Sequence, residues 1–284
     1  MSPWLTLSLA VLFVSFGAVL VRLAAAPPLA VSFYRVAIAA LILLPFAQRD
    51  ARRSWPALDG RRRLLLLAAG LALALHFASW IASLSYTTVA SSVLLVNTAP
   101  LFAVVLSRLF LHERPPVVVQ VAIPVAFAGA ALIALGDWTG SPGSLLGNGL
   151  AVAGAVTLAI YQVVGRGLRD ALPLDAYVLA VWGTAALALV ALALSFGVPL
   201  GGYPERTWLV FVALAIVPTI GGHGFINKSL RSLPAPTVGL FLLGEPVLAS
   251  LLAWMLFRET PGPWTLAGGA VVLGALGLVL ARRP

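Results

Sequence analysis

The sequence of 284 residues contains no cysteine, which excludes disulfide bonds, thiolate metal ligands and cysteine nucleophiles. Charged residues are also scarce: they make up 10% of the chain, whereas soluble domains carry about 25%. Apolar residues account for 61%, above the roughly 45–50% of soluble proteins. So little charge cannot cover a soluble surface, and the composition therefore predicts a protein that lies in a lipid bilayer.

The few charges are mostly positive, and the formal net charge is +9. In a soluble protein this excess would suggest a nucleic-acid partner, but here Lys and Arg gather in short segments between apolar runs. Such segments determine topology and contact anionic lipid headgroups, so we expect the bilayer as a partner and no nucleic acid. Arg22 follows the first apolar run and no basic residue precedes it, which favours a span over a cleaved signal peptide.

Ten apolar runs are long enough to cross a membrane, which takes about 20 residues in a helix. We place them at 3–21, 29–47, 64–84, 88–110, 115–135, 145–165, 174–196, 207–226, 234–257 and 262–281. Strand-like alternation is absent from these runs, and an open sheet could not satisfy its backbone in lipid. The sequence therefore predicts an all-α polytopic membrane protein with ten transmembrane helices.

The basic residues indicate how these spans are oriented. Alternate connections and the C-terminus carry most of them, at Arg49, Arg52, Arg53, Arg61, Arg62, Arg63, Arg108, Arg114, Arg166, Arg169, Lys228, Arg231, Arg282 and Arg283. The opposite connections hold only Arg22, Arg206 and Arg258. Positively charged loops stay inside, so we expect a multi-pass protein of the inner membrane with both termini in the cytoplasm.

The chain also repeats itself. At a shift of 146 residues, Pro100 falls on Pro246 and Glu113 falls on Glu259. This divides the chain into a first unit at 1–136 and a second at 144–284. Because each unit has five spans, an odd number, the second unit must be inverted relative to the first. Inverted repeats are an architecture of secondary transporters, in which a central site lies between the halves.

Several motifs in these units carry a family resemblance. In the first unit they are residues 84–92 (LSYTTVASS), 97–101 (NTAPL) and 111–115 (LHERP). In the second they are residues 227–236 (NKSLRSLPAP), 243–249 (LGEPVLA) and 257–260 (FRET). Each unit resembles the EamA-type unit of the drug/metabolite transporter superfamily. The resemblance implies a ten-span carrier, commonly an exporter of amino acids or related metabolites. Thr260 stands where the family usually has a basic residue, so we do not assign a particular substrate of the family to this chain.

Three polar residues near the repeated prolines are candidates for substrate binding. Glu245 lies deep within a span, where an ionised carboxylate is costly, so it is a candidate for substrate contact or proton transfer. Alternatively it hydrogen-bonds to a backbone carbonyl that Pro246 leaves without a partner. Asn97 and Thr98 lie just before Pro100. They either contact the substrate or make hydrogen bonds between helices.

A polar face on the third span offers further candidates. The spacing of His76, Ser79, Trp80 and Ser83 places them on one face of a helix. His223 falls within one residue of His76 under the repeat. Two histidines without carboxylate or cysteine companions make a weak metal site, so we expect no metal and no other cofactor. We interpret these side chains as walls of a substrate cavity, with plain packing as the alternative, especially for Trp80.

Tyr161 and Gln162 interrupt an apolar span and are natural partners for a polar ligand. Arg35 lies within the second span, about 9 Å from its outer end at 1.5 Å per residue. Three roles stay open for it: its side chain extends outward to the headgroups, pairs with a carboxylate, or attracts an anionic group of the substrate.

These patterns predict a secondary transporter of a small metabolite that works by alternating access, with proton coupling through Glu245 as one mechanism. Alternatives are a passive facilitator or exchanger, and an exporter of organic cations and drugs. An intramembrane enzyme is disfavoured, since the chain has no Gly-x-Ser-x-Gly elbow and no His-Glu-x-x-His helix. A channel would favour rings of like charge or carbonyl filters, and neither is evident.

Overall fold

The computed structural model describes residues 1–87, 89–136, 144–168, 171–258 and 263–281. Every regular element in these residues is helical, so the fold is that of an all-α polytopic protein, as the sequence predicts. Seven helical segments are long and apolar enough to cross a membrane. Three shorter apolar helices lie at Ala99–Leu111, Val117–Gly129 and Leu266–Val279. All of these segments coincide with expected spans, and the count of ten crossings stays a prediction because three of them are short.

The first half of the chain contains eight helical elements. They are α1 (Pro3–Leu23), α2 (Pro28–Ser54), the 3₁₀ turn η1 (Trp55–Ala57), α3 (Gly60–Ser83), α4 (Val89–Val96), α5 (Ala99–Leu106), the π-helical η2 (Ser107–Leu111) and α6 (Val117–Gly136). The second half contains α7 (Ser144–Leu168), α8 (Leu174–Ser195), α9 (Glu205–Leu214), the π-helical η3 (Ala215–His223), α10 (Gly224–Ser229), α11 (Ala235–Leu242), α12 (Glu245–Phe257) and α13 (Pro263–Ala281).

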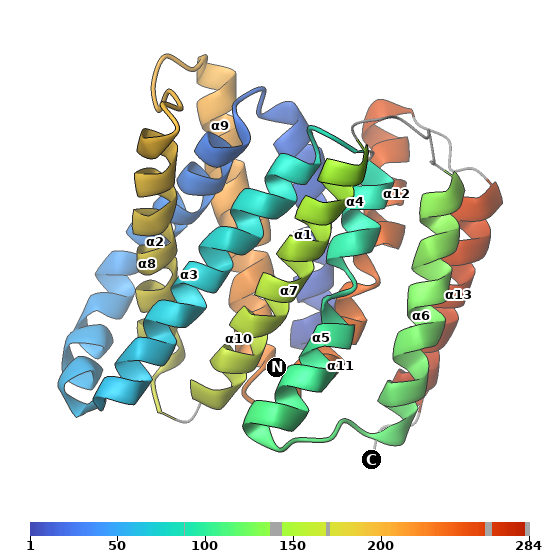
Figure 1. Cartoon of the computed structure of the whole chain (residues 1–284), viewed down its shortest axis with the longest axis horizontal. Coiled ribbons are helices and arrows are strands. Elements are labelled where there is room, and N and C mark those ends of the chain that lie inside the picture. The colour runs from blue at the N-terminus through green and yellow to red at the C-terminus, as the bar shows by residue number, and fades with distance from the viewer. Residues whose placement is uncertain (88, 137–143, 169–170, 259–262, 282–284) are drawn as a thin grey trace.

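Helices at corresponding places in the two halves run in opposite directions. In Figure 1, α2 descends while its counterpart α8 ascends, and α6 ascends while its counterpart α13 descends. The halves also interleave: α2 packs on α8, α3 packs on α7, and α6 packs on α13. The fold therefore brings residues from both halves of the chain to its centre.

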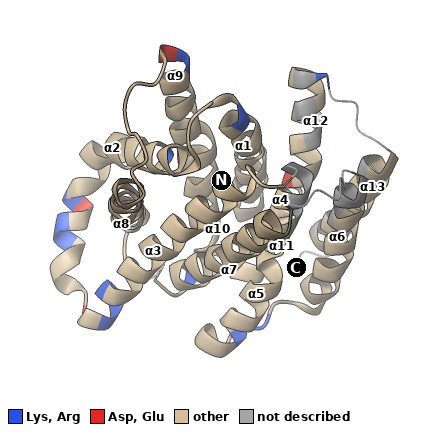
Figure 2. Cartoon of the chain, turned by 45° about the horizontal axis from the view of Figure 1, so that its top comes forward, with Lys and Arg blue, Asp and Glu red and all other residues tan. Residues whose placement is uncertain are grey.

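Charged residues lie mostly at the ends of the helices and leave the long middle sections almost free of charge (Figure 2). This is the distribution that a bilayer imposes, because a charge in the hydrocarbon costs several kcal/mol by insertion measurements, about 2.5–3.5 for Arg or Asp. Large apolar side chains such as Leu71, Val121 and Leu187 are exposed along these middle sections. They form the surface that faces lipid.

Two of the apolar segments break near their middle. α4 ends at Val96 and α5 begins at Ala99, while α11 ends at Leu242 and α12 begins at Glu245. Pro100 and Pro246 lie in the first turn of α5 and α12, where proline is tolerated because its missing N–H would have no partner in the helix. The repeated prolines therefore start new half-helices in the interior of the protein.

Side chains add hydrogen bonds to backbone carbonyls at the first of these breaks. The Asn97 amide nitrogen donates to the Val93 carbonyl at 2.8 Å, and the Thr98 hydroxyl donates to the Leu95 carbonyl at 2.7 Å. The same two carbonyls also accept the backbone N–H groups of Asn97 and Thr98, so they find their partners within the protein, as a backbone at this depth requires.

The π-helical η3 was not expected from the sequence, which predicts one regular span over 207–226. Pro218 lies within η3 and has no N–H to donate. The Thr219 hydroxyl donates to the Leu214 carbonyl at 2.8 Å, five residues earlier. The wider turns of η3 change the faces on which Thr219 and His223 lie, and a regular hydrophobic period cannot reveal that change.

Glycines allow the closest approach between the halves. At Gly70 on α3, an added Cβ would lie 2.5 Å from the Thr184 Cβ and 2.9 Å from the Val181 carbonyl oxygen of α8. Small residues at such crossings let helix backbones approach, which is how helices associate without a hydrophobic effect between them.

We expect Gly70→Ala to lower the free energy of unfolding by about 1–3 kcal/mol, because the backbone of α8 must move away. Gly183→Ala on α8 is the matched control, since its Cβ would meet no atom within 4 Å. That variant should remain as stable as the wild type or gain slightly from helix propensity. Melting temperatures of the proteins in one detergent make the comparison, and equal losses in both would contradict the close contact of α3 and α8.

Candidate functional site

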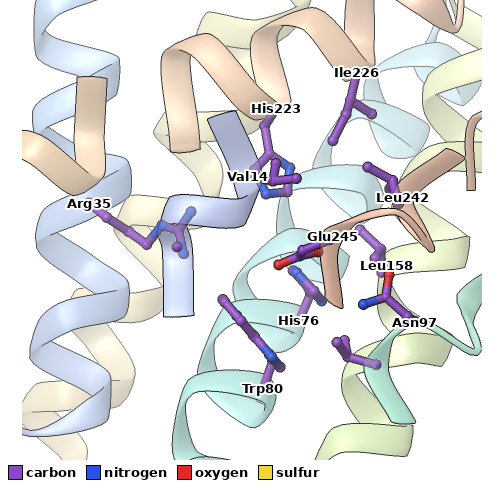
Figure 3. A pocket seen from close by; sticks show the side chains of 12 residues that line it. Val14, Arg35, His76, Trp80, Asn97, Leu158, His223, Ile226, Leu242 and Glu245 are labelled. Carbon is purple, nitrogen blue, oxygen red and sulfur yellow. The ribbon is translucent and has the colours of Figure 1, made fainter. Parts of the chain in front are cut away.

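A cavity lies at the level of the broken helices (Figure 3). Its volume is about 40 Å³, which is enough for a few water molecules. The polar and aromatic side chains that line it are Arg35, His76, Trp80, Asn97, His223 and Glu245. The rest of the wall consists of Val14, Gly17, Val96, Leu158, Ile226 and Leu242.

Both halves of the chain contribute to this wall. The first half supplies α1, α2, α3 and the α4–α5 break, and the second half supplies α7, η3, α10 and the α11–α12 break. The cavity therefore lies between the two units, and any movement of one unit against the other must change its shape.

Glu245 occupies the first position of α12, directly after the break. Its side chain is half-buried, with part of its surface facing the cavity. The side chain of Asn97, from the other break, lines the same cavity. The N-terminus of a helix carries a partial positive charge, which favours a carboxylate at this position. Each of the two breaks thus contributes one polar side chain to the cavity.

Arg35 is 1% exposed and does not extend outward to the membrane surface. Its Nε donates to the Thr219 hydroxyl at 3.1 Å. Its Cζ lies 4.0 Å from the centroid of the Phe77 ring, a cation–π contact. These contacts hold the guanidinium at the cavity wall and link α2 to α3 and η3.

The two histidines lie close together, with ring centroids 6.2 Å apart. His76 is stacked on Trp80, and its Nδ1 is 3.0 Å from the Gly154 carbonyl oxygen. Only a protonated nitrogen can donate to a carbonyl, so this contact assigns the hydrogen to Nδ1 and leaves Nε2 for another partner. Within the described residues, no group of three or more His, Asp or Glu side chains could hold a metal ion.

The remaining predicted side chains lie outside the lining of the cavity. Tyr161 is fully buried and accepts a hydrogen bond from the Asn227 amide. Gln162 is fully buried, and its amide nitrogen and oxygen have no hydrogen-bond partner among the described residues. Thr98 and Ser79 donate to carbonyls of their own segments, those of Leu95 and Leu75.

The structure thus brings together five of the predicted residues in the cavity wall, namely His76, Trp80, Asn97, His223 and Glu245. It leaves the other five, Thr98, Ser79, Ser83, Tyr161 and Gln162, outside that wall. Helical spacing places Ser79 near His76 but cannot show that its hydroxyl returns to the backbone. Sequence reasoning missed Thr219, whose position depends on η3. It also missed Leu158 and Ile226, since an apolar cavity wall looks like any other apolar helix face.

One end of the space between the units is tied together by Arg166, near the C-terminus of α7. Its Nη2 lies 3.0 Å from a Glu113 carboxylate oxygen, and its Nη1 donates to the carbonyls of Leu230 and Arg231. Along α7 it is about 12 Å from Leu158 in the cavity wall. A separate hollow of about 270 Å³ lies at the other ends of α1 and α3, beside residues such as Arg22 and Leu84.

Comparisons with known proteins agree with this architecture. The model of the EamA-like transporter family matches twice, at residues 1–135 and 145–281. An uncharacterized transporter of Archaeoglobus fulgidus is 28% identical over 93% of this chain and 90% of its own. The pseudopaline exporter CntI of Pseudomonas aeruginosa is 25% identical over 88% of this chain and 84% of its own.

A solved crystal structure shares the fold, with a TM-score of 0.78 at 23% identity over 99% of this chain and 98% of that one. The two family matches together span nearly the whole sequence, in the same halves that the internal repeat defines. The chain belongs to the EamA-like transporter family.

Proposed function

We propose that this transporter exports a small metabolite, an amino acid or a related compound, through the central cavity by alternating access. The observation that carries the proposal is the cavity wall, to which broken helices of both units contribute polar side chains. Residues 1–136 and 144–284 act as the two bodies that rock around this site. The name of the Pseudomonas aeruginosa relative, an exporter, supports the direction.

The contact of Arg166 supports alternating access as the mechanism. It joins α7 of the second unit to Glu113 of the first and to the backbone after α10. A carrier needs such a closure at one end of its site while the other end opens, whereas a pore does not. In the proposed orientation this end faces the cytoplasm of a cell bounded by an inner membrane, as the basic connections indicate.

The same orientation places the basic C-terminal part of α2 at the inner leaflet. Arg49, Arg52 and Arg53 line a hollow there with Pro45 and Asp50. Clustered arginines at this level attract anionic headgroups, each contributing about 1 kcal/mol near the surface. Lipid is therefore the proposed partner at this site, and small molecules are the partner at the cavity.

The purified protein in liposomes should catalyse counterflow. Uptake of labelled amino acid should accelerate when unlabelled amino acid is present on the opposite side, because a carrier returns faster when loaded. Gly17→Leu should abolish this acceleration, since the added side chain would fill the space in front of Trp80, whose ring lies 3.5 Å from an added Cβ. Gly149→Leu, where an added Cβ meets nothing within 4 Å, is the control and should behave as wild type. An uptake rate that does not depend on unlabelled amino acid on the opposite side would indicate a passive pore.

Proton coupling through Glu245 makes a separate prediction. If the carboxylate binds a proton in one step and substrate in another, an imposed pH gradient should drive transport in the wild type. In Glu245→Gln the rates with and without the gradient should become equal, whatever their absolute value. Glu205→Gln, at the exposed start of α9, is the control and should keep the wild-type response. A retained response in Glu245→Gln would refute the coupling role and leave passive exchange or another coupling group.

A further inference from the structure

Arg35 is a buried cation that lacks a close counter-charge. It makes no ion pair within 4.0 Å among the described residues, where the recorded pairs are Arg62 with Asp59 and Arg166 with Glu113. Glu245 interacts with it electrostatically only from a longer distance. A buried guanidinium normally pairs with a carboxylate or lines a functional cavity, because the bilayer interior does not solvate it.

The contacts of Arg35 leave one edge of the guanidinium available. Nε is occupied by the Thr219 hydroxyl and the flat face by the Phe77 ring. Nη1 is buried and has no hydrogen-bond partner among the described residues. In Figure 3 the side chain extends from α2 toward the middle of the cavity, where Glu245 and His76 lie. The guanidinium is therefore fixed in place with donors still to satisfy.

The chemistry of the missing partner follows from the geometry of the donors. A guanidinium offers N–H groups in one plane at a fixed spacing, which matches the two oxygens of a carboxylate. Glu245 lies across the cavity and would repel a second negative group but accept an ammonium. The remaining wall is apolar, with Val14, Leu158 and Leu242.

We propose that Arg35 binds the carboxylate of the transported molecule, so that the site selects small carboxylates whose amino group faces Glu245 and whose apolar side chain faces the cavity wall. This rests on the proposed function and specifies the substrate class of the same cavity. The alternative is a structural role, in which Arg35 only ties α2 to η3 through Thr219.

Matched ligands test the proposal on the wild-type protein. L-leucine carries a carboxylate, an ammonium and an apolar side chain, whereas L-leucine amide lacks only the carboxylate. Binding to the purified full-length chain is measured by calorimetry at millimolar ligand. The amide should bind about 10- to 100-fold more weakly, because hydrogen bonds to the charged Arg35 are lost.

Variants of Arg35 then separate recognition from structure. In Arg35→Met the difference between L-leucine and its amide should disappear, because leucine alone loses its partner. Arg35→Lys keeps the charge without the planar donors and should retain part of the difference. Arg61→Met makes the same change at the exposed start of α3 and should preserve the wild-type difference. A structural role would instead weaken both ligands equally. If Arg35→Met does not fold, the comparison of L-leucine with its amide in Arg35→Lys and in the wild type still tests whether Arg35 binds the carboxylate.

Three results would overturn the proposal. One is equal binding of leucine and its amide by the wild type, and another is an undiminished preference for leucine in Arg35→Met. The third is binding of tetraphenylphosphonium, a cation without a carboxylate, when leucine does not bind. Counterflow of that cation would support small-molecule transport but contradict carboxylate binding by Arg35. The two proposals can therefore be refuted independently.

Discussion

The structure depends on one constraint, which is that every backbone N–H and C=O in the hydrocarbon layer must find a partner within the protein. Most of the chain meets it with unbroken helices. The exceptions include the π-helical η2, which lies away from the cavity wall, and three irregular segments around the cavity: the breaks at Asn97–Thr98 and Leu243–Gly244 and the π-helical turns of η3. At these three segments the protein itself, rather than lipid, covers the irregular backbone. Thr98 and Thr219 add hydroxyl donors to backbone carbonyls within these irregular turns.

The fold could be predicted from the sequence because its signals extend over many residues and each has a direct physical cause. Apolar runs mark the helices, arginines mark their ends, and Pro100 with Pro246 mark the two breaks. The site was less predictable. His76 and Ser79 share a helix face, yet only the ring of His76 reaches the cavity, because a hydroxyl so close to the backbone donates to Leu75 instead. Arg35 left three roles open, since sequence shows the depth of a side chain but not its direction.

The repeat builds a nearly symmetric frame, but the chemistry of the cavity is not symmetric. Under the shift of 146 residues Glu245 corresponds to Ala99, and Arg35 corresponds to Val181. The cation therefore comes from the first unit and the carboxylate from the second. In a fully symmetric cavity the two would be duplicated and like charges would face each other. Divergence of the units thus supplies a site with a defined polarity, into which an asymmetric molecule fits in one orientation.

The small volume of the cavity affects the measured dissociation constant of a substrate. At about 40 Å³ it holds a few water molecules, so a metabolite can enter only after the surrounding helices separate. The binding-competent form is then a minority, and the apparent dissociation constant exceeds the intrinsic one by the inverse of its population. The contacts of Arg166, with the Glu113 carboxylate and two backbone carbonyls, help to set that population. Residues that never touch the ligand therefore control how tightly it is held, and natural variation in affinity among such carriers can arise far from the site of contact.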